Sequence, residues 1–175
     1  MAQPSVRDPS ELAEFLAEVG IDSTDGDPVL LSALVAGLVS GLASVEPGLQ
    51  LRCAIELERV TRKRHDLLEP HKATLLRPLT AGCAPDVQWL VARVVPRLDL
   101  DDEERAVALE SMVRLFEESP TGVVEANALQ AIVALAEGHP EHEELAGRCT
   151  QQALASSSAI LRARAWRLVT QRKRR

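Results

Sequence analysis

The chain has 175 residues, a length that suits one domain or one array of repeats with a buried core. Hydrophobic residues make up 46% of the chain and aromatic residues only 2%, so any core must be built from aliphatic side chains. The formal net charge of -6 argues against a surface devoted to polyanion binding, which needs an excess of Lys and Arg.

Residues 1–27 are expected to form a tail and a short capping helix. The opening MAQPSVRDPS has no apolar run behind a basic start, so we do not expect a secretory signal. Asp8-Pro9-Ser10-Glu11 is typical of a capped helix start with proline in the first turn. One face of this helix would carry Leu12, Phe15, Leu16 and Val19. We expect the helix to cover the first end of the core.

Two further helices are predicted before residue 65. The apolar run from Pro28 to Leu42 is shorter than the ~20 residues needed to span a bilayer, so we expect no membrane span there. Ser44-Val45-Glu46-Pro47-Gly48 interrupts it, because proline lacks the amide that a continuing helix donates. The segment from Leu49 to Arg64 is then amphipathic and increasingly basic.

The segment from Asp101 to Gly138 predicts two antiparallel helices. It opens with four acids, which a helix N-terminus favours, and breaks at Ser119-Pro120-Thr121-Gly122. The first helix would place on its apolar face Val107, Leu109, Met112, Val113 and Phe116. The second would place there Val124, Ala128, Ala131, Ile132 and Leu135. Gly138 is well placed to end it, with Pro140 just beyond.

This two-helix pattern recurs along the chain at an interval of 37 residues. Apolar or small side chains match in the set Leu38, Leu75, Met112 and Cys149, and in the set Ala54, Val91, Ala128 and Ala165. Val95, Ile132 and Val169 also recur at this interval, but the matching residue of the first two-helix unit is the charged Glu58. This mismatch points to a slip of one residue in the second helix of that unit. Pro96 predicts a kink in the next one.

No sustained alternation of apolar and polar residues indicates a strand, so we predict an all-α chain. Two-helix units of this length resemble the HEAT and armadillo class of α-solenoids. The resemblance implies a short right-handed α-solenoid of about four helical hairpins, within residues 28–175. The expected units are 28–64, 65–100, 101–138 and 139–175. The tetratricopeptide class fits less well, because its pattern expects Tyr and this chain has none.

In solenoids of this kind the second helix of each hairpin lines the concave face, and its polar columns predict a binding surface. The residues that this resemblance places on or near that face are Glu56, Trp89, Arg93, Arg97, Gln130, Arg164 and Arg167. Such a surface suits an acidic peptide or a phosphate backbone. The plainer interpretation is a charged face exposed to solvent.

Sequence motifs do not favour an enzyme. No GxSxG, P-loop or GxGxxG is present, and neither histidine cluster has the HExxH spacing of a zinc site. The three cysteines, Cys53, Cys83 and Cys149, are widely spaced, so we expect free thiols in a reducing cytoplasm and neither metal nor cofactor. The basic end of the chain, Gln171 to Arg175, suits a helix C-terminus, and Trp166 is expected in the core.

We therefore expect a non-enzymatic cytoplasmic scaffold or adaptor that binds a protein segment along the concave face. The alternative is a nucleic-acid-binding or DNA-repair protein, because alkylpurine DNA glycosylases also have a HEAT-like fold; the net charge disfavours it. A third possibility is a HEAT-like lyase or carrier that holds a chromophore or cofactor, but no residue set points to one. No membrane partner is expected, and the oligomeric state stays open.

Overall fold

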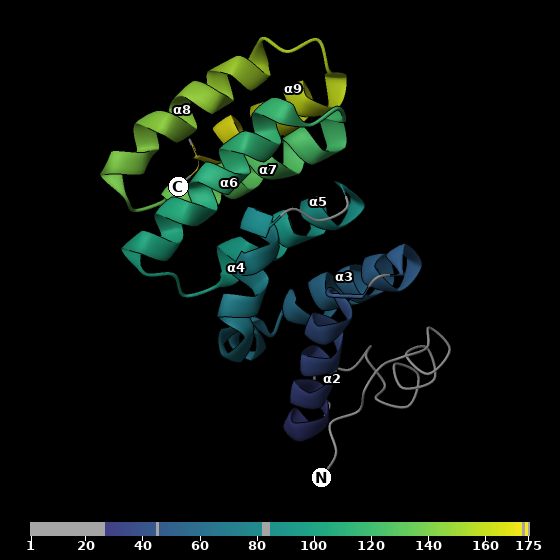
Figure 1. Ribbon diagram of the computed structural model, residues 1–175. Coiled ribbons are helices and arrows are strands. Elements are labelled where there is room, and N and C mark those ends of the chain that lie inside the picture. Colours follow the sequence, from purple (N-terminus) through teal and green to yellow (C-terminus); the bar gives the residue numbers. More distant parts are fainter. Residues whose placement is uncertain (1–26, 45, 82–84, 173, 175) are drawn as a thin grey trace.

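The structure, a computed structural model, describes residues 27–44, 46–81, 85–172 and 174. Within these residues the helices are joined by short non-helical segments, and there is no strand (Figure 1). The α-helices are α2 (Pro28–Gly41), α3 (Pro47–Thr61), α4 (Lys72–Ala81), α5 (Pro85–Val94), α6 (Asp102–Glu118), α7 (Gly122–Ala136), α8 (Pro140–Leu154) and α9 (Ala159–Arg172). Two 3-10 helices, η1 (His65–His71) and η2 (Val95–Arg97), precede α4 and follow α5. The tail and capping helix expected in residues 1–27 lie outside the described part.

The ends of α6 and α7 follow from local chemistry. The Asp101 carboxylate accepts a hydrogen bond from the Glu104 amide at 2.8 Å, and the Glu104 carboxylate accepts one from the Asp101 amide at 3.0 Å. This reciprocal pair is a capping box, which satisfies two amides that have no partner inside the helix. At the end of α7, Gly138 has a φ of 80°, a left-handed conformation that glycine adopts without strain.

Pro96 changes the end of α5, as a proline inside a helix should. The α-helix stops at Val94, and the chain continues as the 3-10 helix η2 through Arg97. The expected kink is therefore a change of helix type at the proline.

Neighbouring helices pack in pairs: α2 contacts α3, α4 contacts α5, α6 contacts α7 and α8 contacts α9. The second members also contact one another in succession, α3 with α5, α5 with α7 and α7 with α9. Figure 1 shows α2 and α3 at one end of the molecule and α8 and α9 at the other. Among the described residues, one cluster of buried hydrophobic side chains, most of them aliphatic, runs through these contacts from Leu34 to Ala165.

The matched positions point into this core. One column, Leu38, Leu75, Met112 and Cys149, is buried in every member. So is a second column, Ala54, Val91, Ala128 and Ala165. Small side chains in the second column let the helices approach closely, which suits a core with few aromatic residues.

Three expectations about burial are wrong. Val107 lies 41% exposed on α6, and Trp166, expected in the core, lies 62% exposed on α9. The slip expected at Glu58 does not occur, because Glu58 is only 4% exposed and occupies the buried column of Val95 and Ile132. Its charge is met by arginines, which a pattern of apolar residues does not reveal.

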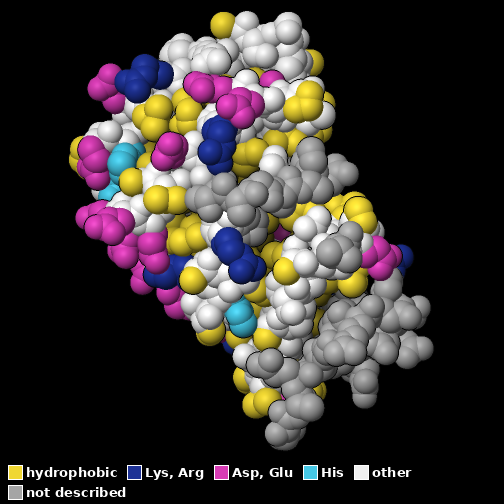
Figure 2. Space-filling model, in the orientation of Figure 1, with side chains coloured by type: hydrophobic (Ala, Val, Ile, Leu, Met, Phe, Trp, Pro, Cys, Tyr) yellow, Lys and Arg dark blue, Asp and Glu magenta, His cyan; other side chains and the backbone are white. Residues whose placement is uncertain are grey.

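Every helix in the described part of the chain is too short or too polar to span a lipid bilayer. Acidic side chains gather on the surface where α6 and α8 begin, as Figure 2 shows. The first turns of these helices contain Asp102, Glu103, Glu104, Glu141 and Glu143. The positive end of the helix dipole favours carboxylates there.

Candidate binding site

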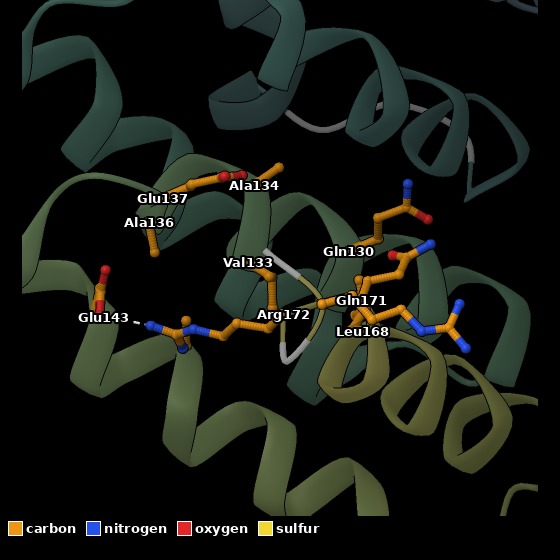
Figure 3. Close-up of a pocket in the computed structure, with 11 residues that line it drawn as sticks. Gln130, Val133, Ala134, Ala136, Glu137, Glu143, Leu168, Gln171 and Arg172 are labelled. Atoms are coloured by element: carbon orange, nitrogen blue, oxygen red, sulfur yellow. Dashed lines mark hydrogen bonds and ion pairs between the residues drawn. The ribbon is translucent and has the colours of Figure 1, made fainter.

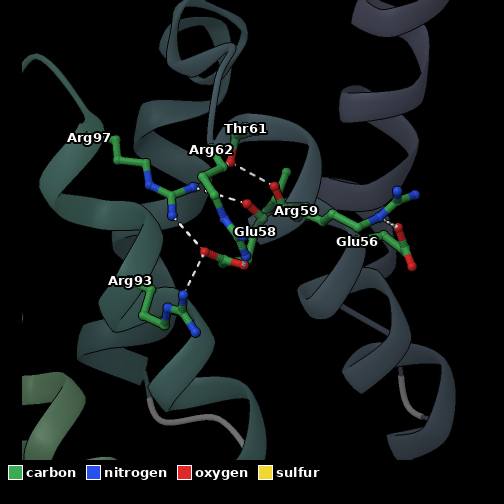
Figure 4. A network of polar contacts seen from close by, with 8 residues as sticks. Glu56, Glu58, Arg59, Thr61, Arg62, Arg93 and Arg97 are labelled. Carbon is green, nitrogen blue, oxygen red and sulfur yellow. Dashed lines mark hydrogen bonds and ion pairs between the residues drawn. The ribbon is translucent and has the colours of Figure 1, made fainter. Parts of the chain in front are cut away.

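Glu58 is the centre of an ion-pair network between α3 and α5 (Figure 4). Its carboxylate lies 2.7 Å from Arg62, 3.0 Å from Arg93 and 2.7 Å from Arg97. Arg97 also donates hydrogen bonds to the Glu58 carbonyl and to the Thr61 hydroxyl, each at 3.1 Å. The network therefore fixes the end of α3 against the end of α5.

The ionised form of Glu58 is favoured despite its burial. Burial alone raises the pKa of a carboxyl, but hydrogen bonds from Arg62 and Arg97 and the charges of Arg93 and Arg97 outweigh it. The pKa of Glu58 is therefore lowered from its ordinary value. A buried negative charge here keeps two of the predicted binding arginines, Arg93 and Arg97, close to α3.

The predicted binding residues divide into two groups. The first group, Glu56 and Arg97, is paired with residues of α3. Glu56 accepts a hydrogen bond from Arg59 on its own helix at 2.7 Å, and Arg97 donates one to the Glu58 carboxylate. The second group comprises Arg93 on α5, Gln130 on α7, and Arg164 and Arg167 on α9, which we call the arginine cluster. Trp89 belongs to α5, but its side chain lies outside what the structure describes.

The arginine cluster gathers positive charge from two helices. Arg164 donates a hydrogen bond to the Gln130 side-chain oxygen, which ties α9 to α7. Burial lowers the pKa of Arg164, and the positive charges of Arg167 and Arg93 lower it further. No carboxylate of the described residues forms an ion pair with Arg164 or Arg167. An anionic group placed here would relieve the repulsion between these guanidinium groups.

A cavity of 640 Å³ opens beside the cluster, between α7, α8 and α9 (Figure 3). Gln130 belongs to the arginine cluster and also lines the cavity. The apolar lining of the cavity comes from Val133, Ala134, Ala136, Ala146 and Leu168. Arg172 of α9 and Glu143 of α8 form an ion pair at 2.6 Å on its wall. The sequence pattern did not predict this cavity, because it depends on how α9 is placed against α7 and α8.

Two further groups of described residues could carry chemistry, the histidines at the start of α8 and the buried cysteines. Glu141 lies 3.7 Å from His139 and 3.8 Å from His142 at the start of α8, and no group of three such ligands in the described residues could hold a metal. Cys53 and Cys149 are buried free thiols, and burial raises the pKa of Cys53 to about 11. A thiol with that pKa is a poor nucleophile at neutral pH. Cys83 lies outside the described residues.

Comparison with known proteins supplies no relative for this chain. No protein-family model, no curated protein and no solved structure matches it. The function must therefore be argued from the arginine cluster and its surroundings.

Proposed function

We propose that the chain is a short right-handed α-solenoid of about four HEAT-like hairpins, in residues 28–64, 65–100, 101–138 and 139–175. Support comes from the succession of contacts α3 to α5, α5 to α7 and α7 to α9. The burial of the columns at 37-residue intervals supports it as well, because stacked units bury equivalent side chains.

We further propose that the protein acts without catalysis, by binding an acidic segment of a partner protein at the arginine cluster. The observation that carries this proposal is the grouping of Arg93, Arg164 and Arg167, of which Arg164 and Arg167 lack a carboxylate partner among the described residues. Carboxylates form charge-assisted, often bidentate hydrogen bonds with guanidinium groups. The chain would serve as a scaffold or adaptor for such a segment.

A protein segment fits this surface better than a nucleic acid. Nucleic-acid binding requires many phosphate contacts over a positively charged surface. This chain has a formal net charge of -6, and acids gather where α6 and α8 begin. A short acidic segment needs only the local positive charge of the cluster.

The test measures binding of a fluorescently labelled peptide of alternating Glu and Ser, the extended peptide, by fluorescence anisotropy. The double variant R164E/R167E should weaken binding by roughly tenfold or more, because it replaces attraction with repulsion. The control is the double variant R52E/R148E, which makes the same charge change at exposed positions of α3 and α8. Equal affinity of the wild type and the double variant would refute the proposal.

Duplex DNA serves as the second probe in the same assay. A logarithm of affinity that falls steeply with the logarithm of salt concentration, and that depends on the same arginines, would favour the nucleic-acid alternative. Weak DNA binding that is unaffected by R164E/R167E would favour the protein segment.

A further inference from the structure

The outward side of α9 is an apolar and basic helix surface that no described helix covers. Ile160 is 54% exposed and Trp166 is 62% exposed, while Leu161 and Ala165 on the opposite side are buried. Ala163 and Arg167 are exposed on the same side as these two. We call this surface, formed by Ile160, Ala163, Trp166 and Arg167, the α9 surface.

Trp166 occupies a position that is core in the two preceding units, although Ile55, at the same place in the first unit, is 43% exposed. The residues at the equivalent place, each 37 positions earlier, are Leu129 in α7 and Ala92 in α5, and both are completely buried. A large aromatic side chain exposed among other apolar side chains is typical of a surface that another molecule covers. Tryptophan and arginine are also the side chains most enriched among residues that dominate binding energy.

The apolar surface extends toward the start of α7. A side chain added at Gly122 would overlap the hydroxyl of Ser158, so the beginnings of α7 and α9 lie against each other. The next residue of α7, Val123, is 46% exposed and stands 37 positions before Ile160. Exposed apolar side chains therefore occur on two adjoining helix starts, rather than singly.

The charge of α9 defines the kind of partner. This helix contains four arginines and no acid, namely Arg162, Arg164, Arg167 and Arg172. Arg172 is paired with Glu143, and Arg162 donates a hydrogen bond to the Ser156 carbonyl. Arg164 and Arg167 remain for an anionic partner, next to exposed Trp166.

We propose that the α9 surface binds an acidic amphipathic helix of a partner protein. The apolar side of that helix would contact Trp166 and Ile160, and its carboxylates would pair with Arg164 and Arg167. A helix suits this site because α3 packs against α5, α5 against α7 and α7 against α9. A partner helix would occupy the corresponding place beside α9. The proposal rests on the proposed function and adds the partner's conformation and its apolar anchors.

The test compares two labelled peptides of identical composition. In the amphipathic peptide, Leu recurs at i, i+3, i+4 and i+7 among Glu and Ala; in the scrambled peptide, the Leu residues do not share a helix face. The wild-type protein should bind the amphipathic peptide roughly tenfold more tightly than the scrambled one. Circular dichroism should show the amphipathic peptide becoming more helical in the complex.

Trp166→Ala should remove this preference, reducing affinity for the amphipathic peptide by roughly tenfold, because it deletes the main apolar contact. It should leave binding of the extended peptide unchanged. The control is Ile55→Ala, which truncates a 43% exposed apolar side chain on α3. Unchanged thermal unfolding of both variants would show that each remains folded.

The outcomes separate the two proposals. If R164E/R167E weakens the extended peptide but Trp166→Ala leaves the amphipathic peptide unaffected, the arginine cluster stands and the α9 surface proposal fails. If neither variant changes any affinity, both proposals fail. Tighter, Trp166-dependent binding to phosphatidylserine vesicles than to the amphipathic peptide would also overturn the inference, in favour of a membrane surface.

Discussion

Glu58 joins α3 to α5 and η2 through ion pairs with Arg93 at 3.0 Å and Arg97 at 2.7 Å. Because Arg93 also belongs to the arginine cluster, the same carboxylate stabilises the fold and holds a binding residue in place. Removing one member of a buried ion pair is costly, since the other members lose their compensating charge.

Glu58→Gln should therefore lower the free energy of unfolding by about 3 kcal/mol, since Gln keeps the shape but not the charge. Urea denaturation would measure the change. Glu56→Gln is the control, because its partner Arg59 is exposed and such pairs contribute about 1 kcal/mol or less. Equal effects of the two substitutions would contradict the structural role of Glu58.

The lowered pKa of Glu58 also predicts a dependence of stability on pH. The carboxyl binds a proton more readily in the unfolded chain, so its contribution is present above the unfolded pKa of about 4.3 and is lost as the pH falls through the folded pKa. Stability of the wild type should decrease more steeply than that of Glu58→Gln over this acid range. Parallel stability curves for the two proteins would show that Glu58 contributes nothing to acid sensitivity.

Gly41 sets how closely α2 approaches α3. A Cβ at this position would overlap the Cys53 Sγ atom and lie 3.2 Å from its Cβ, and Cys53 is completely buried. Gly41→Ala should therefore destabilise the protein by about 1–3 kcal/mol through overpacking, although Ala favours helices.

Gly147 in α8 provides the matched control, since nothing lies within 4 Å of the place where its Cβ would be. Gly147→Ala should stabilise the protein by about 0.5–1 kcal/mol, the usual difference between these residues inside a helix. Thermal unfolding of both variants would measure the contrast. A stabilising Gly41→Ala would mean that α2 and α3 can separate without cost.

At the scale of elements, the beginning of α6 depends on the capping box of Asp101 and Glu104. Asp101→Ala removes the acceptor for the Glu104 amide and should cost about 1 kcal/mol, measured by urea denaturation. Asp101→Asn keeps a side-chain acceptor and should recover most of that loss. If Asn performed no better than Ala, the side-chain cap would not be what stabilises the helix start.

At the scale of the whole molecule, a solenoid should tolerate removal of its last unit better than a closed bundle. Helices α2 to α7 are linked by contacts that involve neither α8 nor α9, namely α2 with α3, α3 with α5, α4 with α5 and α6, and α7 with α5 and α6. A chain lacking residues 139–175 should therefore keep most of the helicity of the remaining segments but unfold at a lower temperature, as circular dichroism would show. Removing residues 159–175 alone should give an intermediate unfolding temperature. Complete loss of helicity in the shorter chain would argue for a single closed core.

The sequence by itself determined the helices and the columns that they bury. Proline, glycine and acidic residues set helix ends through local bonds, as at Asp101 and Pro96, and aliphatic side chains such as Leu38 and Met112 are buried wherever a helix packs. These features depend on neighbours within a few residues, so they can be predicted from the amino-acid sequence alone.

Only the tertiary structure decided which charges meet and which apolar side chains stay uncovered. Glu58 is buried because Arg93 of α5 and Arg97 of η2, 35 and 39 residues further along, reach it. Trp166 is exposed because no described helix covers the outward side of α9, although the equivalent Leu129 is core. Both outcomes depend on the placement of helices that are distant in the chain, and periodicity within one helix contains no information about that placement.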